Sequence, residues 1–198
     1  MFDKNIMIEV FEKLLSQSKK SYDEFNAADG KIGDGDLGIT ILNGLEEINN
    51  NINEFKDDLS VNFMLCSKAF VKKSGSSFGT LIAFCFMSIS KNLDGKKSCN
   101  HDDIINLVDT AMKTIQERGK TKVGDKTILD TLSFILENLK KTNDDLNYSE
   151  IFKKSTKEAL QAFEGKKILI GRARMFEDKT KDLDDPGMLA LHKLSEAF

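Results

Sequence analysis

The chain has 198 residues, of which 40% are hydrophobic and 31% charged, a composition typical of a soluble globular protein with a substantial core. Its net charge is −3 and its basic residues are scattered, so no nucleic-acid partner is expected. The N-terminus carries an acid at Asp3, and no apolar run approaches the roughly 18 residues of a membrane span. We therefore expect no signal peptide, no membrane partner and a cytoplasmic location.

Apolar residues recur at helical intervals along most of the chain, as at Ile6, Val10 and Leu14, and the sequence holds only one proline. No clean alternating pattern typical of strands interrupts them. We therefore predict an all-α fold in which residues 1–198 form a single domain. About eight helices are expected, in chain order at 4–24, 38–55, 61–72, 79–92, 101–118, 127–141, 148–163 and 186–198.

Polar residues at the expected helix starts support these boundaries. Asn100 is followed three residues later by Asp103, and Asn147 by Glu150, the pattern of an N-cap with an acid at the third helical position. The pair Asp185-Pro186 is typical of an N-cap followed by proline in the first turn. These signals place the glycine-rich and polar segments between helices.

The first such segment runs from Asp29 to Gly38 and holds three carboxylates, Asp29, Asp34 and Asp36, together with four glycines. Clustered aspartate oxygens suit Mg²⁺, which takes the rest of its ligands from water and nucleotide phosphates. The alternatives are a solvated acidic turn or a calcium loop. An EF-hand needs a glutamate at its twelfth position, where this chain has Thr40 or Leu45, so magnesium is favoured.

Three further segments precede predicted helices. Residues 72–80 are rich in serine and glycine, and a helix N-terminus favours anions, although a flexible connector has the same composition and the P-loop spacing is missing. In residues 118–130 and 171–187, Lys126 and Arg172 could complement phosphates, and Asp185 could both cap a helix and contact a ligand. Each of these could equally form surface ion pairs.

The two histidines, His101 and His192, lie in predicted helices without a serine or cysteine at a telling position. A hydrolase that uses a serine, histidine and aspartate triad is therefore not expected.

Taken together and in this order, the four segments resemble the nucleotide-binding L subunit of bacterial dihydroxyacetone kinases, a domain that also forms the C-terminal half of single-chain dihydroxyacetone kinases. The resemblance runs from about Asp29 to Gly187. The matching pieces are Asp29 with GDGD at 33–36, SGSSFGT at 74–80, RGK and GDKT within 118–127, GRA at 171–173 and DPG at 185–187.

This resemblance implies a barrel of eight amphipathic helices that binds ADP or ATP through the loops at one end. It assigns two Mg²⁺ ions to Asp29, Asp34 and Asp36. It places Leu37, Gly38, Ile39, Thr40, Lys73 and Ser74 against the phosphates. It places the remaining residues around the nucleoside, namely Gly119, Ile128, Arg172, Asp185, Pro186 and Gly187. Arg172 is thereby assigned to the nucleotide and not to the metal cage.

In the family, a separate subunit holds dihydroxyacetone, so the expected partner is a dihydroxyacetone-binding kinase subunit. The length of the free-standing chain favours the branch in which bound ADP is rephosphorylated by a phosphotransferase-system protein over the branch that exchanges ATP. Leu37 stands where the family usually has histidine. The alternatives are therefore a non-catalytic nucleotide-sensing or partner-binding paralogue, or a kinase acting on another substrate.

Overall fold

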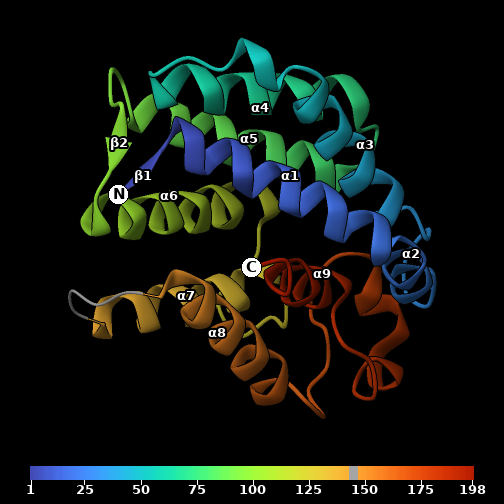
Figure 1. Cartoon of the computed structure of the whole chain (residues 1–198). Helices are drawn as coiled ribbons and strands as arrows, with labels where there is room; N and C mark the ends of the chain where they lie inside the picture. Colours follow the sequence, from blue (N-terminus) through green and yellow to red (C-terminus); the bar gives the residue numbers. More distant parts are fainter. Residues whose placement is uncertain (143–146) are drawn as a thin grey trace.

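The computed structural model describes residues 1–142 and 147–198 (Figure 1). Within them the chain is all-α, as predicted, with nine α-helices, two 3-10 segments and two very short strands. The α-helices are α1 (Lys4–Lys20), α2 (Tyr22–Gly30), α3 (Leu37–Asn50), α4 (Leu59–Lys73), α5 (Ser77–Asn92), α6 (His101–Gly119), α7 (Ile128–Lys141), α8 (Tyr148–Ala162) and α9 (Pro186–Ser195). The 3-10 segments are η1 (Ile52–Glu54) and η2 (Arg172–Thr180), and the strands are β1 (Phe2–Asp3) and β2 (Ser98–Cys99).

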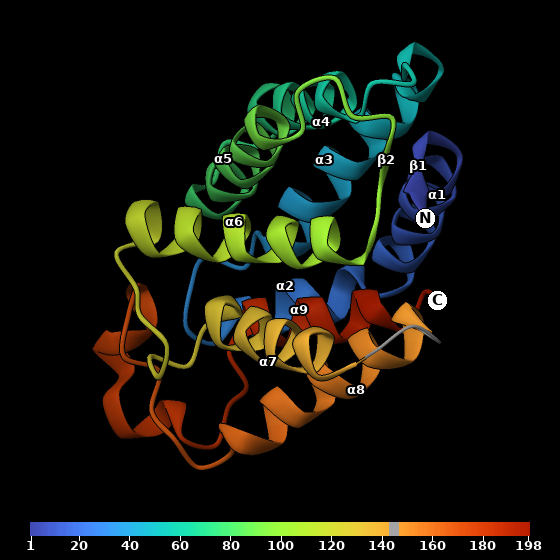
Figure 2. The same ribbon diagram turned by 90° about the vertical axis from the view of Figure 1, so that its left-hand side faces the viewer.

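The helices close into a ring. From α3 to α9 each helix packs on the next one along the chain, and α9 returns to contact both α1 and α2. In Figure 2, α6 and α7 lie one above the other, and the connection between them runs beside η2 at one end of the molecule. Because several connections meet at this end, loops that are far apart in the sequence lie close together there.

The predicted helix 4–24 is in fact two helices that meet at Ser21. The Ser18 hydroxyl donates to the Leu15 carbonyl at 2.9 Å, and serine side chains that bond the backbone in this way weaken a helix. The second helix, α2, is anchored by Phe25, which is fully buried, and it runs on to Gly30. This extension places Asp29 in the last turn of a helix, where the sequence predicted a loop.

The predicted caps are present. The Asn100 carboxamide and the Asp103 carboxylate form a reciprocal capping box at the start of α6, and Asp185 accepts from the Met188 amide at 3.0 Å at the start of α9. The two strands, which the sequence did not predict, pair antiparallel and join the N-terminus to the α5–α6 connection. The 3-10 segment η2 was also missed, because it carries no apolar period; within it Glu177 has φ 45° and ψ −120°.

The main hydrophobic core lies between α1, α3, α4 and α5, and includes Met7, Ile48, Leu59 and Cys66. A small separate cluster of Ile32, Ile168 and Ala173 joins the acidic loop to the segment before α9. No helix in the described ranges has both the length and the apolar character needed to cross a membrane.

Candidate magnesium and nucleotide site

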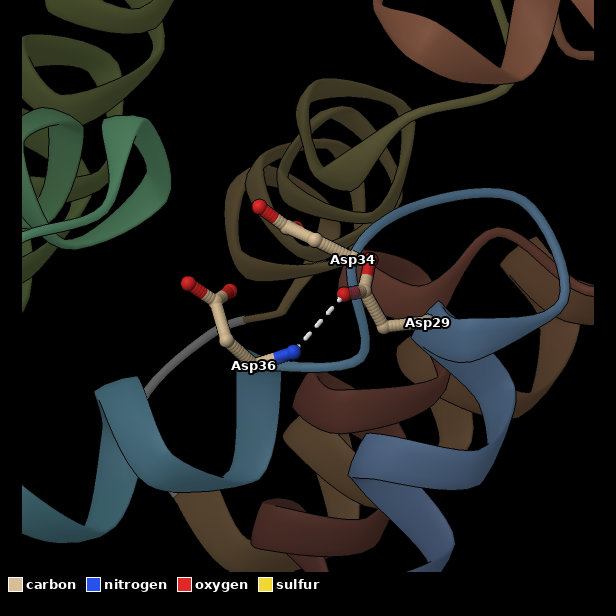
Figure 3. A group of neighbouring side chains, drawn as sticks. All are labelled: Asp29, Asp34 and Asp36. Carbon is tan, nitrogen blue, oxygen red and sulfur yellow. Dashed lines mark hydrogen bonds between the residues drawn. The ribbon is translucent and has the colours of Figure 1, made fainter.

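The three predicted metal ligands converge. Asp29 lies in the last turn of α2, Asp34 lies in the following loop, and Asp36 immediately precedes α3. One carboxylate oxygen from each lies within 4.8 Å of those of the other two (Figure 3). Oxygen atoms at this spacing form the kind of donor set that a hard divalent cation prefers.

Backbone amides hold the first of these carboxylates in place. One Asp29 oxygen, Oδ2, accepts from the Gly35 amide at 2.7 Å and from the Asp36 amide at 3.1 Å. The chain must pass very close to this side chain, because a Cβ at Gly33 would lie only 2.5 Å from Asp29 Oδ1. Gly35 has φ +73°, a conformation that glycine adopts readily. Gly33 and Gly35 are therefore favoured by the geometry of this loop.

Asn26 is a residue of this site that the sequence analysis did not single out. Its Oδ1 atom accepts from the amides of Gly38 at 2.7 Å and Ile39 at 3.3 Å, and so caps α3 from the neighbouring helix α2. The Asp36 side chain, at the N-cap position of α3, makes no capping bond. Its carboxylate is thus left for the acidic cluster, and Asn26 fixes the relative position of α2 and α3.

The charges of the cluster are not balanced evenly. Burial, together with the nearby carboxylates of Asp34 and Asp29, raises the pKa of Asp36. By contrast, the Arg172 guanidinium forms an ion pair with Asp34 and holds the pKa of that carboxyl below its usual value. A cation between the three carboxylates would relieve the repulsion felt by Asp36. The residues present therefore fit a magnesium site.

The cluster lies at the edge of a cavity of about 570 Å³, a volume within the range of small-molecule sites. Loops from both halves of the chain line it. Its polar lining includes the three aspartates, Ser76, Ser77 and Arg172, and its apolar lining includes Phe78, Leu81, Ile115, Ile128 and Pro186. One ligand with both charged and apolar parts would match this lining.

The serine-rich loop enters the cavity through Gly75, Ser76 and Ser77. Ser76 caps α5, since its hydroxyl accepts from the Gly79 amide at 3.0 Å and from the Thr40 hydroxyl at 2.8 Å. The amides of Ser77 and Phe78, in the first turn of α5, have no acceptor within the helix. This helix start can therefore receive an anion, as the sequence suggested.

Asp185 borders the cavity from the opposite loop. Burial raises the pKa of its carboxyl to about 7, although the amides of Met188 and Gly187 act in the other direction. It both caps α9 and lines the cavity, the two roles considered for it from the sequence.

The structure brings most of the predicted site residues to the cavity, but not all of them. Those that line it, besides the three aspartates, are Leu37, Gly119, Ile128, Arg172, Asp185, Pro186 and Gly187. The predicted phosphate contacts Gly38, Ile39, Thr40, Lys73 and Ser74 are absent from the lining. Thr40 is buried against Ser76, and the Lys73 ammonium lies 3.8 Å from a Glu47 carboxylate oxygen.

Two charged residues differ from their sequence-based interpretation. Arg172 contacts the cluster of aspartates itself through Asp34, whereas the resemblance assigned it to the nucleotide alone. Lys126, considered a possible phosphate ligand, is 2% exposed, does not line the cavity and donates to two backbone carbonyls. Both histidines bond within the fold, His101 with the Tyr148 hydroxyl and His192 with the Thr156 hydroxyl.

The fold and the site thus define a class: an all-α domain with a carboxylate cluster beside a loop-built cavity. A family model described as the DAK2 domain matches residues 31–198, and the chain belongs to this family. Its relatives include proteins named as ADP-binding subunits of dihydroxyacetone kinases, which confirms the resemblance noted in the sequence.

Two of these relatives come from bacteria. The chain is 30% identical over 115 residues to the ADP-binding subunit DhaL of PEP-dependent dihydroxyacetone kinase 2 from Listeria innocua, covering 57% of this chain and 53% of that one. It is 28% identical over 173 residues to the ADP-binding subunit DhaL of PTS-dependent dihydroxyacetone kinase from Lactococcus lactis, covering 86% and 82%. The match thus spans about half of the first relative and most of the second.

A solved structure shares the fold. The dihydroxyacetone kinase from C. freundii, described as a complex with AMP-PNP and Mg²⁺, aligns with a TM-score of 0.74 at 20% identity. The alignment covers 98% of this chain and 33% of that one. The chain therefore corresponds in fold to about a third of that kinase.

Proposed function

We propose that this chain is the ADP-binding, phosphoryl-donor subunit of a dihydroxyacetone kinase. The observation that supports this most directly is the cluster of Asp29, Asp34 and Asp36 on the wall of a cavity that is lined elsewhere by both polar and apolar residues. A nucleoside diphosphate with magnesium likewise has a charged part, the phosphates and the cation, and an uncharged part, the sugar and the aromatic base. The names of the bacterial relatives agree with this assignment.

In this proposal Asp29, Asp34 and Asp36 hold two Mg²⁺ ions. The ions supply charge neutralisation to the phosphates, which is the main requirement of phosphoryl transfer. The amides of Ser77 and Phe78 at the start of α5 donate to a phosphate oxygen. Arg172, which reaches the cluster, adds a positively charged side chain beside the same phosphates.

The nucleoside occupies the apolar part of the cavity. Gly119 and Ile128 lie on one side of it, and Asp185, Pro186 and Gly187 contribute the start of α9. One predicted phosphate contact that does not line the cavity supports a residue that does. Thr40 holds the Ser76 hydroxyl that caps α5.

The phosphoryl acceptor is dihydroxyacetone held by a separate partner subunit, and the phosphoryl group comes from a phosphotransferase-system protein that recharges bound ADP. The chain offers a donor site of carboxylates, amides and a guanidinium. Such a site suits phosphoryl transfer to a hydroxyl that another protein activates.

The test combines the purified chain with a dihydroxyacetone-loaded partner subunit. Magnesium and ADP with a charged phosphotransferase-system donor should give dihydroxyacetone phosphate, and ATP alone should support at most one turnover. Repeated turnover with ATP alone would contradict the phosphotransferase dependence. Failure of the stripped chain to bind ADP with magnesium would contradict the nucleotide assignment itself.

A second candidate, a nucleotide sensor without turnover, is favoured by one residue. Leu37 directly follows the cluster and lines the cavity with an apolar side chain that can neither donate nor accept a proton. A chain that binds ADP with magnesium but transfers no phosphoryl group to any loaded partner would support this candidate. Activity restored by Leu37→His would attribute the defect to this position.

A further inference from the structure

A buried lysine outside the cavity ties together two distant parts of the chain. Lys126 is 2% exposed, and its Nζ atom donates to the Lys166 carbonyl at 2.8 Å and to the Thr180 carbonyl at 3.3 Å. A buried ammonium is costly unless it is hydrogen-bonded, so these carbonyls are strong partners for it. Its backbone has φ 60°, which is uncommon for lysine and marks a constrained position.

The two carbonyls stand at the ends of one loop. Residues 166–180 leave the region after α8, pass through η2 and return, and the single ammonium joins their start to their end. Loops of this kind, whose ends lie close together, are compact units. Two further bonds support the same closure, from the Leu169 amide to the Asp125 carbonyl and from the Ile168 amide to the Thr180 hydroxyl.

This loop carries Arg172 to the cavity. Arg172 of this loop pairs with Asp34 of the acidic cluster, and Ile168 and Ala173 pack on Ile32 beside the same cluster. The residue that follows the lysine, Thr127, caps α7 and lines the cavity. The ammonium therefore connects one wall of the cavity to the loop that forms another.

We propose that Lys126 is a positioning residue: its ammonium holds the two ends of the 166–180 loop together and thereby places Arg172 beside the three aspartates and the nucleotide. The expected effect of Lys126 on ADP binding rests on the proposed nucleotide-binding function. Its role in closing the loop is independent of that function. Burial lowers the pKa of this ammonium, while the carboxylates of Asp184, Asp185 and Asp182 act to keep it charged.

The test is Lys126→Met, which keeps the apolar, unbranched body of the side chain, one atom shorter, and removes its donors. The affinity for ADP with magnesium should fall on the order of tenfold, a fold-change typical of losing a hydrogen bond to a charged group. Trypsin, which cuts after lysine and arginine, should cleave within residues 166–181 about tenfold faster than in the wild type at a temperature well below unfolding. Leu139→Ala is the control, because it opens a cavity at a fully buried residue of α7, the helix that follows Lys126, and this residue does not line the site.

A double variant separates positioning from general destabilisation. If Lys126 acts through Arg172, then Lys126→Met combined with Arg172→Ala should bind ADP no more weakly than the weaker single variant. The inference would be overturned if the losses of ADP affinity in the two single variants multiplied in the double variant. It would also be overturned if trypsin cleaved the loop of Lys126→Met no faster than the loop of Leu139→Ala. A wild-type protein that fails to bind ADP with magnesium would refute the proposed function, while the cleavage rates would still decide whether the lysine closes the loop.

Discussion

Replacing Gly33 by alanine should disturb the cluster of Asp29, Asp34 and Asp36 while leaving the fold intact. The added Cβ would lie 2.5 Å from Asp29 Oδ1, almost an ångström inside the 3.4 Å at which ordinary contact begins, and 3.1 Å from the Asp29 carbonyl oxygen. The carbonyl belongs to the last turn of α2 and moves little, so the carboxylate must turn away. That movement breaks or stretches the bonds from the amides of Gly35 and Asp36.

The size of the effect follows from those bonds. A hydrogen bond to a charged group contributes about 1.5–3 kcal/mol, and the half-exposed position of Asp29 points to the lower end. We expect the free energy of unfolding to fall by about 1–2 kcal/mol, which lowers the melting temperature by roughly 2–8 °C. Displacing a metal ligand through its supporting contacts typically costs 10–100-fold in metal affinity, so ADP with magnesium should bind about 10–100-fold more weakly.

Gly75→Ala is the matched control. Gly75 lines the same cavity, but a Cβ there would meet no atom within 4 Å. Thermal melts of the metal-free proteins, together with calorimetric titration of ADP in magnesium and in EDTA, measure both quantities. Wild-type affinity in Gly33→Ala, or an equal loss in Gly75→Ala, would refute the assignment of the cluster as a metal site held by Asp29.

Three further predictions concern the charges of the site. Asp36→Asn should raise the melting temperature of the metal-free protein, since the pKa of Asp36 is raised by burial and by its acidic neighbours. The same variant should abolish magnesium-dependent ADP binding. A lower melting temperature would contradict the first expectation. Arg172→Ala should weaken ADP binding yet tighten binding of Mg²⁺ alone, because it frees Asp34, and calorimetry showing both affinities reduced would speak against competition between arginine and metal. The pKa of Asp185 rises from 3.8 to about 7 on folding, so its protonated form favours the folded state and this stability is lost as the pH rises across that interval. Asp185→Asn keeps the cap and should lose less stability over the same interval in thermal melts, whereas parallel pH profiles would exclude Asp185 as the titrating group.

The convergence of the three carboxylates could be predicted because they are close together in the sequence. Asp29, Asp34 and Asp36 fall within eight residues of each other, so a tight glycine-containing loop necessarily brings them together. The helices and their caps were likewise readable, since an N-cap such as Asn100 bonds an amide only three residues away. The error at residues 4–24 arose because the apolar spacing continues across Ser21, where the helix is in fact interrupted. The position of this break depends on the hydrogen bond of the Ser18 hydroxyl and on the burial of Phe25.

What only the tertiary structure decided are contacts between residues far apart in the chain. Asn26 caps a helix other than its own, Arg172 reaches Asp34 across most of the sequence, and Lys126 turns inward to two carbonyls. In the sequence alone, each of these three polar residues is as compatible with a solvent-exposed position as with a position in a binding site. Their roles depend on which loops the closed ring of helices brings to one end, and no local spacing of residues encodes that choice.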